Sequence, residues 1–289
     1  MKFAINLPPF ADFSSPLFLA DLAVEAESAG WDGFFVWDHI MFDPSFYPIA
    51  DPWVALAAVA ARTQRIRLGT MITPIARRRP WVLARQTISL DRLSQGRLNL
   101  GVGLGVPEQW EYGFFGEDVD AKIRAEKLDE GLAILTGLWS AEKFSFQGKH
   151  YQLNEVIFRP APVQQPRIPI WVGGFWPRKA PFRRAARFDG VVPGKMDGML
   201  TPNDWRDLLV FIASQRTATT PYDAVHSELL PDDSAQARRR VQEFADAGVT
   251  WWVQPVDPWS HNNDWERPWV PADTERMVRL VKQGPPGLS

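Results

Sequence analysis

Residues 168–179 read IPIWVGGFWPRK and display the repeating unit of the chain. Ile168, Ile170 and Val172 are β-branched and alternate along the stretch, which favours a strand buried in a parallel sheet. A helix is expected to begin near Pro177, because proline suits the first turn of a helix. A strand that is followed at once by a helix predicts a βα unit.

Gly173 and Gly174 lie between this strand and this helix, and they let the backbone approach another group closely. The first amides of a helix have no intrahelical partner and carry a partial positive charge. With Arg178 and Lys179 beside them, these amides suit a phosphate group. The same residues would also form an ordinary tight turn with solvated charges, so both interpretations stay open at this point.

Eight such βα units follow one another, because short apolar runs alternate with longer amphipathic stretches. Strands are expected at Lys2–Leu7, Gly33–Trp37, Ile66–Met71, Arg97–Val102, Ile168–Val172, Gly190–Val192, Tyr222–Ser227 and Thr250–Gln254. Helices are expected at Pro16–Ala29, Pro52–Thr63, Pro80–Leu93, Ala121–Trp139, Pro181–Arg187, Pro202–Ser214, Ser234–Ala247 and Ala272–Lys282. This pattern predicts an α/β fold, a single (β/α)8 barrel domain over residues 1–289, rather than an open doubly wound sheet. Residues 142–167 contain a hairpin pattern around Gly148 and several prolines, which predict an excursion from the barrel.

The composition favours small-molecule chemistry. The net charge is -2 and no basic block is long enough for a nucleic-acid surface. The chain has no cysteine, which excludes disulfides and thiolate chemistry and fits a reducing compartment. There is no run of about 18 apolar residues, which a membrane-spanning helix would need. The apolar run at the N-terminus is too short for a signal peptide. We therefore expect a soluble cytoplasmic protein without a membrane partner.

The second predicted strand ends in Trp37-Asp38-His39, at the end of the barrel where such enzymes carry their chemistry. His39 can move a proton near neutral pH, and Asp38 can fix its tautomer. A lone histidine in a loop is more often structural, so this role needs support from neighbouring residues.

Other strand ends give weaker signals. Residues 70–72 and the run Arg77–Arg79 follow strand three and would either contact an anionic ligand or form a solvated face. Residues 101–105, GVGLG, lack the spacing of a dinucleotide fingerprint, and instead predict that the backbone passes close to a large flat group. The histidines lack metal-site spacing, so no metal is predicted. Lys195 could form a Schiff base, as in an aldolase, or be an exposed lysine.

Six motifs, in this order, resemble the bacterial luciferase-like family of flavin-dependent oxidoreductases. They are GWDGFFVWDH at 30–39, RTQRIRLGTMITPIARRRP at 62–80, LDRLSQGRLNLGVGLG at 90–105, KLDEGLAILTGLW at 127–139, FQGKHYQL at 146–153 and PIWVGGFWPRKAPFRRAARFDGVVP at 169–193. The family includes dehydrogenases and reductases that use the deazaflavin F420, and FMN monooxygenases. The resemblance spans nearly the whole chain and implies a (β/α)8 barrel with one flavin or deazaflavin ring in its mouth.

The resemblance also implies which residues bind this cofactor. The phosphate would lie at Gly173 and Gly174, and many members have a non-prolyl cis peptide behind the ring, which is expected here at or near Met71-Ile72. The full set of cofactor-binding residues implied by the resemblance and the strand ends is His39, Thr70, Met71, Ile72, Gly103, Gly173, Gly174, Phe175 and Trp176.

The chain departs from the family at two places. Relatives that oxidise sugar phosphates place a glutamate directly after the strand-four glycines, where this chain has Val106, and Glu108 two residues later is the candidate second acid. The small residues that follow Gly-Gly in the family are replaced by Phe-Trp-Pro at 175–177, which would narrow the phosphate pocket.

The expected function is therefore hydride transfer between F420 or FMN and a small organic substrate, with His39, Asp38 and Glu108 as catalytic residues. Trp37, Trp110, Phe175 and Trp176 are expected to form a substrate wall or part of the core.

F420 is favoured over FMN, because the Asp38-His39 pair resembles the deazaflavin branch and Arg77–Arg79 could meet the anionic tail of F420. The alternatives are an FMN monooxygenase that needs a separate reductase, a non-catalytic flavin-binding protein, and the aldolase. A homodimer is expected.

Overall fold

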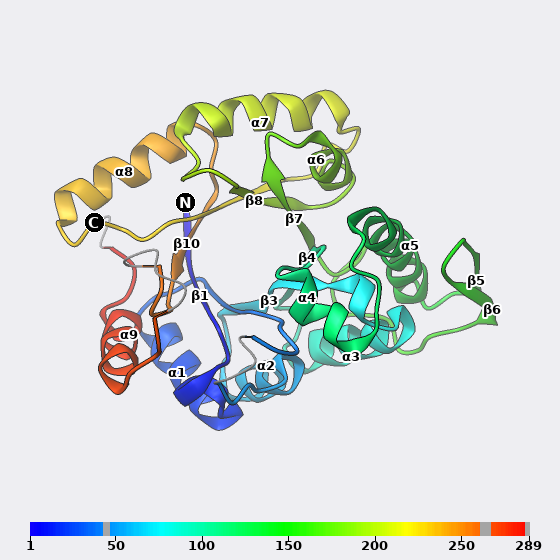
Figure 1. Ribbon diagram of the computed structural model, residues 1–289, viewed down its shortest axis with the longest axis horizontal. Coiled ribbons are helices and arrows are strands. Elements are labelled where there is room, and N and C mark those ends of the chain that lie inside the picture. The colour runs from blue at the N-terminus through cyan, green and yellow to red at the C-terminus, as the bar shows by residue number, and fades with distance from the viewer. Residues whose placement is uncertain (43–46, 261–266, 287–289) are drawn as a thin grey trace.

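The computed structural model describes residues 1–42, 47–260 and 267–286. Parallel strands close into a barrel in the order β1-β10-β9-β8-β7-β4-β3-β2, so the last strand pairs with the first (Figure 1). The strands are β1 (Lys2–Leu7), β2 (Gly33–Val36), β3 (Arg67–Pro74), β4 (Leu98–Gly103), β7 (Ile170–Trp176), β8 (Gly190–Lys195), β9 (Asp223–Ser227) and β10 (Trp251–Pro255). The predicted (β/α)8 barrel is confirmed.

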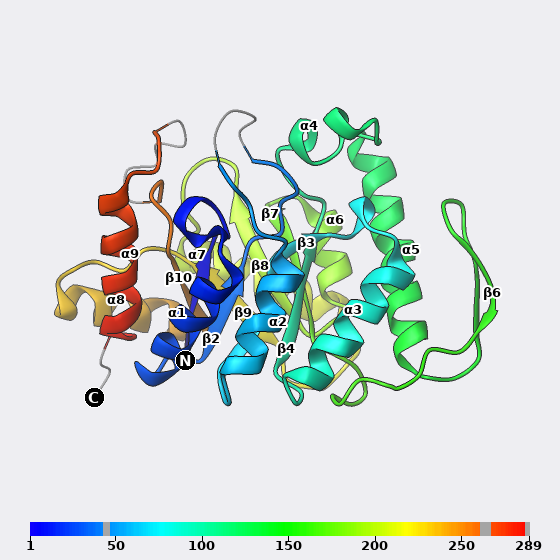
Figure 2. The ribbon, with the colours of Figure 1, turned by 90° about the horizontal axis from the view of Figure 1, so that it is seen from below.

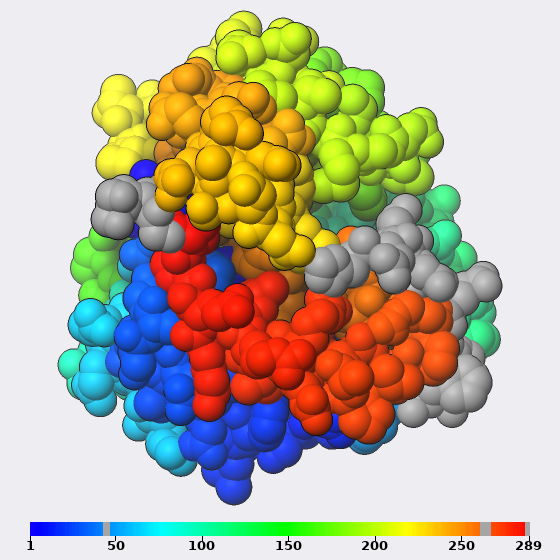
Figure 3. Space-filling model, turned by 90° about the vertical axis from the view of Figure 1, so that its left-hand side faces the viewer, coloured from blue at the N-terminus to red at the C-terminus, as the bar shows by residue number. Residues whose placement is uncertain are grey.

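A helix follows each barrel strand and covers the outside of the barrel. The helices are α1 (Pro16–Ser28), α2 (Pro52–Arg62), α3 (Pro80–Leu93), α5 (Ala121–Trp139), α6 (Lys179–Ala185), α7 (Pro202–Gln215), α8 (Ser234–Asp246) and α9 (Pro271–Gln283). Proline opens α1, α2, α3, α7 and α9, where its missing N–H leaves no helical bond unmade. Helix α9 packs against α1 and completes the outer ring (Figure 3). Within the described ranges, no helix is long and apolar enough to cross a membrane.

Aromatic rings fill the lower part of the barrel interior. Phe35, Trp171 and Trp251 point inward and pack together, with ring centroids 5.1 to 6.2 Å apart. The indole nitrogens of Trp171 and Trp251 donate hydrogen bonds to the Asp223 carboxylate at 3.0 and 2.9 Å. Since both indoles have partners, two large rings can be buried here without an unpaired donor. The lower half is thus a packed core, and space for a ligand is expected at the carboxyl ends of the strands.

The structure corrects the boundaries predicted for the stretch at 168–179. Strand β7 begins at Ile170 and continues through both glycines to Trp176, and α6 runs two residues ahead of its predicted position. The glycines therefore lie within a strand and not in a turn. A Cβ atom on Gly174 would lie 2.3 Å from Cβ of Pro181, so this glycine lets α6 pack against the end of β7.

The excursion between α5 and β7 is present as predicted. It contains an antiparallel hairpin of β5 (Phe144–Gln147) and β6 (Gln152–Val156), which lies at the side of the barrel (Figures 1 and 2). The Glu130 carboxylate of α5 accepts hydrogen bonds from three successive backbone amides, those of residues 149–151. The single carboxylate of Glu130 therefore fixes the hairpin turn to α5.

Candidate active site

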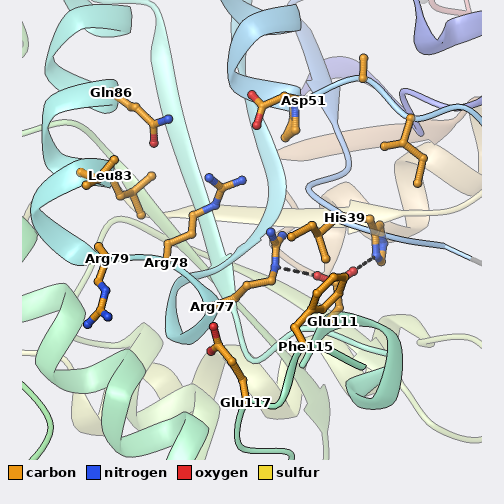
Figure 4. A pocket seen from close by; sticks show the side chains of 15 residues that line it. His39, Asp51, Arg77, Arg78, Arg79, Leu83, Gln86, Glu111, Phe115 and Glu117 are labelled. Atoms are coloured by element: carbon orange, nitrogen blue, oxygen red, sulfur yellow. Dashed lines mark hydrogen bonds and ion pairs between the residues drawn. The ribbon is translucent and has the colours of Figure 1, made fainter. Parts of the chain in front are cut away.

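The carboxyl ends of the strands form the barrel mouth, at the end of the molecule where α4 (Glu108–Glu111) lies (Figure 2). The end of β2 leads to His39, α4 presents Glu111, and the 3-10 turn η2 (Ile75–Arg77) presents Arg77. His39 Nδ1 lies 2.6 Å from Glu111 Oε1, and Arg77 Nε lies 2.8 Å from Glu111 Oε2 (Figure 4). Three segments that are distant in sequence thus join in one ionic network.

This network orients the imidazole ring of His39. The Glu111 side chain is fully buried, whereas the His39 side chain keeps 16% of its surface exposed. An ionised carboxylate can only accept hydrogen bonds, so Nδ1 of His39 donates its hydrogen to Glu111. Nε2 is then the ring nitrogen that does not contact Glu111. The imidazole ring is held in one orientation by a buried side chain.

Asp38 does not orient His39, and this prediction is wrong. The buried Asp38 carboxylate accepts hydrogen bonds from Nη2 of Arg77 at 2.8 Å and from Nη2 of Arg78 at 2.6 Å. Burial raises the pKa of Asp38, but Arg78 and Arg77 outweigh burial and hold this pKa below its usual value. The arginine run after β3 lies beside the end of β2 and neutralises Asp38, which leaves the imidazole to the carboxylate from α4.

Glu108, the predicted second acid, is exposed at the first position of α4. Glu111, one turn later, takes the position next to His39. Glu111 is not apparent from the sequence, because a helix of four residues is too short to show a helical period. The available signal was Pro107, which precedes α4 and marks the start of a helical turn.

An aromatic cluster lies beside His39, and its members come from the loops after β1, β2, β4 and β10. We call Phe10, Trp37, Phe42, Trp110 and Trp259 the mouth aromatic cluster. Phe42 is central, with ring centroids 5.1 Å from Phe10, 5.4 Å from Trp110 and 5.4 Å from Trp259. Phe10 and Trp259 are buried, whereas the other three rings are half-buried. Of the predicted wall residues, Trp37 lies beside His39, with ring centroids 5.8 Å apart, whereas Trp110 joins the cluster through Phe42.

The opposite side of the mouth is built from glycine. Strands β4, β7 and β8 turn glycine inward at their ends, and we call Gly101, Gly103, Gly173 and Gly194 the glycine wall. The expected cis peptide is present at Met71-Ile72. A Cβ atom on Gly103 would lie 2.3 Å from Cδ1 of Ile72, so the Ile72 side chain occupies the space that the missing side chain leaves. The wall is consequently backbone with two apolar side chains against it, Ile72 at Gly103 and Gly173 and Phe175 at Gly194.

Two predicted cofactor residues, Thr70 and Trp176, have other surroundings than the mouth. Thr70 is fully buried, and its Oγ1 lies 2.8 Å from Oγ1 of Thr73. The Thr73 hydroxyl donates a hydrogen bond to Asp38, so Thr70 contacts the ion network through Thr73. Trp176 is buried against Phe182 on the helix side of β7 and does not face the mouth. Phe175 does point inward, because it pairs in register with Gly194 of the glycine wall.

Two adjoining cavities lie along Arg77–Arg79: the larger lies between the first turns of α2 and α3 and the segment that contains α4, and the smaller lies toward α5 and the hairpin turn. The larger, of about 580 Å³, is lined by His39, Glu111, Asp51, Gln86 and Arg77–Arg79 among others (Figure 4). The smaller, of about 400 Å³, shares Arg77–Arg79 and Glu117 with it. The predicted arginine run thus borders both cavities, although Arg77 and Arg78 are already paired with Asp38.

Lys195, the aldolase candidate, donates a hydrogen bond from Nζ to Asp204 Oδ2 at 2.9 Å. A Schiff-base lysine needs a free, neutral amine, and an ion pair with a carboxylate opposes that state. In the part of the chain that the structure describes, no three histidine or acidic side chains are grouped as metal ligands. His261 lies outside the described residues.

Residues 1–198 match the family model described as luciferase-like monooxygenase, and the chain belongs to this family.

Among relatives, the chain is similar to an F420-dependent glucose-6-phosphate dehydrogenase of Nakamurella multipartita, with 35% identity over 203 residues that make up 66% of this chain and 56% of the relative. It is also similar to an uncharacterized protein of Mycobacterium tuberculosis, with 30% identity over 81% of this chain and 83% of that protein. The chain spans between 47% and 59% of the length of the F420-dependent relatives it matches.

Among solved structures, the fold is similar to that of an F420-dependent secondary alcohol dehydrogenase in complex with an F420-acetone adduct. The TM-score is 0.74 at 16% identity, and the match covers 90% of this chain and 94% of that chain.

Proposed function

We propose that the protein is an oxidoreductase that uses a flavin-type cofactor, F420 or FMN, to exchange a hydride with a small organic substrate. The observation that carries this proposal is the His39–Glu111 pair, because it places an oriented acid–base group at the mouth, across from a flat backbone wall. When bound, the cofactor supplies the hydride chemistry. The chain supplies binding, orientation and the proton.

The glycine wall fits the planar ring of such a cofactor. Its strands present backbone where a larger side chain would stand in the way, and Ile72 offers an apolar face at the back of the space. Residues 173–176 stay our proposal for the phosphate, with Arg178 nearby as an exposed cation for which no ion pair is found in the described ranges. Lys179 is less suited, because its Nζ lies 3.6 Å from the ring centroid of Trp176.

His39 would move the proton that accompanies hydride transfer. For an alcohol substrate, Nε2 accepts the hydroxyl proton while the carbon loses its hydride, and in the reverse direction Nε2 returns a proton to the carbonyl oxygen. Glu111 holds the ring throughout, and Arg77 holds Glu111.

The first experiment is a spectrum and mass of the cofactor that purifies with the protein, followed by fluorescence titration with F420 and with FMN. We expect binding in the micromolar range or tighter. The variant His39→Ala should keep cofactor affinity within about threefold and lower turnover by about 100-fold on a substrate that is found. A protein that binds neither cofactor would refute the proposed function.

F420 is favoured over FMN because several similar relatives are named F420-dependent. The arginine run supports F420 less than its sequence suggested, since Arg77 and Arg78 pair with Asp38 and leave Arg79 for an anionic tail. Arg79→Ser should weaken F420 binding about threefold at low salt and leave FMN binding unchanged. Micromolar FMN binding without F420 binding would favour an FMN monooxygenase with a separate reductase.

The predicted homodimer and the predicted cytoplasmic location stay part of this proposal. Size-exclusion chromatography with light scattering measures the oligomeric state directly.

A further inference from the structure

The smaller cavity contains a buried hydroxyl group that has no partner. Tyr151 lies in the hairpin turn, lines this cavity and is 8% exposed, and no hydrogen bond of its hydroxyl is found among the described residues. The other three tyrosines of the chain differ. The hydroxyls of Tyr112 and Tyr222 donate to backbone carbonyls at 2.8 and 3.2 Å, and that of Tyr47 accepts from a backbone amide. A buried hydroxyl that stays unpaired costs free energy, so this one is suited to a ligand.

The Tyr151 side chain is fixed in place. The Glu130 carboxylate of α5 accepts a hydrogen bond from its backbone amide at 3.0 Å. Trp81, in the first turn of α3, packs edge-on against its ring, with centroids 6.3 Å apart. Burial raises the pKa of Tyr151 to about 12, so the hydroxyl keeps its proton at neutral pH and can donate it. The cavity therefore has a preorganised hydrogen-bond donor.

Arg79 supplies a cation to the same cavity. Its exposed guanidinium lies 6.0 Å from the Trp81 ring, and no ion pair or hydrogen bond of this side chain is found in the described part of the chain. It lies on the opposite side of the larger cavity from His39 (Figure 4). Its charge reaches Tyr151, because it lowers the pKa of that hydroxyl against the larger effect of burial. Arg79 is also the N-cap of α3 and gives no side-chain cap, so the partial positive charge of the helix start adds to its own.

Most other charges around this cavity are paired. Lys127 Nζ lies 2.8 Å from Asp118, and His150 Nε2 lies 2.8 Å from Glu126. The other two arginines of the run are held by buried carboxylates. Glu117 is exposed, and no ion pair of its side chain is found within the described ranges. Its carboxylate is thus the charge on this cavity that opposes an anion.

We propose that the smaller cavity binds an oxyanion, a carboxylate or phosphate group, whose oxygens accept hydrogen bonds from Tyr151 Oη and from the Arg79 guanidinium. A guanidinium fork and a fixed hydroxyl match the several acceptor oxygens of such a group. The volume of about 400 Å³ holds the group with further atoms attached to it. The oxyanion comes either from the anionic tail of a bound deazaflavin or from a free small anion, and only the first source rests on the proposed function.

The test is calorimetric titration of the cofactor-free protein with glutarate and with inorganic phosphate. Tyr151→Phe removes only the unpaired hydroxyl, so we expect about fivefold weaker binding of the better probe and an unchanged melting temperature. Tyr222→Phe is the matched control, because it removes a hydroxyl that is bonded to the Ala185 carbonyl. It should lower the melting temperature and leave the affinity for the probe unchanged. If neither probe binds, or if the two variants bind the probe equally well, the proposal is wrong.

A second variant tests the sign of the charge. Glu117→Gln removes the opposing carboxylate and should tighten binding of the probe about twofold at low salt. Glu108→Gln, at an exposed position that does not line the cavity, should have no effect. Weaker binding in Glu117→Gln would show that the cavity selects a cation, and would overturn the proposal.

The source of the oxyanion is found by titration with F420 and with F420 from which the glutamates have been removed. If the tail occupies the cavity, Tyr151→Phe weakens F420 binding about threefold and leaves the shortened cofactor unaffected. If both cofactor affinities are unchanged while glutarate or phosphate binding is weakened, the site takes a free anion. A protein that binds no cofactor would count against the proposed function, whereas binding of the probes would still support this site.

Discussion

Strands β4, β7 and β8 reach the barrel mouth with glycine, whereas the loops after β10, β1 and β2 reach it with aromatic rings. The two halves also differ in where their residues lie. The glycine wall belongs to the strands themselves, where register and packing leave little freedom. Most of the mouth aromatic cluster lies beyond the strand ends, in segments that tolerate change. In this barrel, the glycine side of the mouth is therefore built into the sheet, and the aromatic side is carried by loops.

The buried ion network between the ends of β2 and β3 should give the largest stability effect. Asp38→Asn leaves the buried guanidinium of Arg78 without its carboxylate and removes one of the two that Arg77 contacts, and we expect a loss of about 3–5 kcal/mol in the free energy of unfolding. Urea denaturation measures it. Asp21→Asn is the control, because its exposed ion pair with Arg62 should contribute at most about 1 kcal/mol. Equal losses in both variants would show that the buried Asp38 network stabilises the fold no more than an exposed ion pair does.

The same carboxylate should give an acid-side signature. The pKa of Asp38 is lower in the folded protein than in the unfolded chain, where it is about 3.9. The stabilisation is thus fully present above this unfolded value and is lost as pH falls through the folded value. The melting temperature of wild type should fall more steeply below about pH 4 than that of Asp38→Asn. Parallel curves would contradict the assignment.

A side chain on the glycine wall should weaken cofactor binding. Gly103→Val would place atoms where Cδ1 of Ile72 lies, and we expect at least 100-fold weaker cofactor binding, about 2.7 kcal/mol, with a modest loss of stability from overpacking. Adding Ile72→Ala should restore stability, measured by thermal melting, because it removes the clash. Unchanged cofactor affinity in Gly103→Val would contradict this role of the glycine wall.

Glu111→Gln should act on the acid–base group and on neither binding surface. An amide cannot stabilise a protonated imidazole as a carboxylate does, so we expect turnover about 10-fold lower and a shifted pH profile, with cofactor affinity unchanged. Nitrogen NMR of His39 should show the loss of the fixed Nδ1–H tautomer. Glu108→Gln, at an exposed position of the same short helix, is the control and should match wild type.

The smallest effect should lie outside both halves, on the outer face of β9. Burial lowers the pKa of His226, although Glu228 Oε2 lies 3.0 Å from its Nε2. The unfolded chain binds a proton at about pH 6.5 that the folded protein resists, so stability should decrease as pH falls below that value. His226→Gln should flatten this part of the melting-temperature profile without changing the affinity for the cofactor. An unchanged slope would remove His226 as its source.

Most of the fold could be predicted from the sequence, because each βα unit shows its own period. The error at β7 arose because Gly173 and Gly174 were interpreted as a turn. The reason for Gly174 is a tertiary contact with Pro181, which no local pattern displays.

The site was predictable to the extent that it follows strand ends. His39 was found in this way, since position after β2 is a property of the sequence. Its partner Glu111 lies 72 residues away and on a helix of four residues, so neither periodicity nor spacing connects the two. Asp38 was misassigned because adjacency in sequence was taken for contact, whereas successive residues at a strand end point in different directions.

The pairing of β1 with β10 has a consequence for synthesis on the ribosome. Lys2 and its neighbours reach their partners only when Trp251 and the residues after it have been made. Until then one edge of β1 stays unpaired, and unpaired strand edges are sites of aggregation in nascent chains. Completion of the ring therefore waits for nearly the whole chain, and premature termination ahead of residue 251 would release an open sheet.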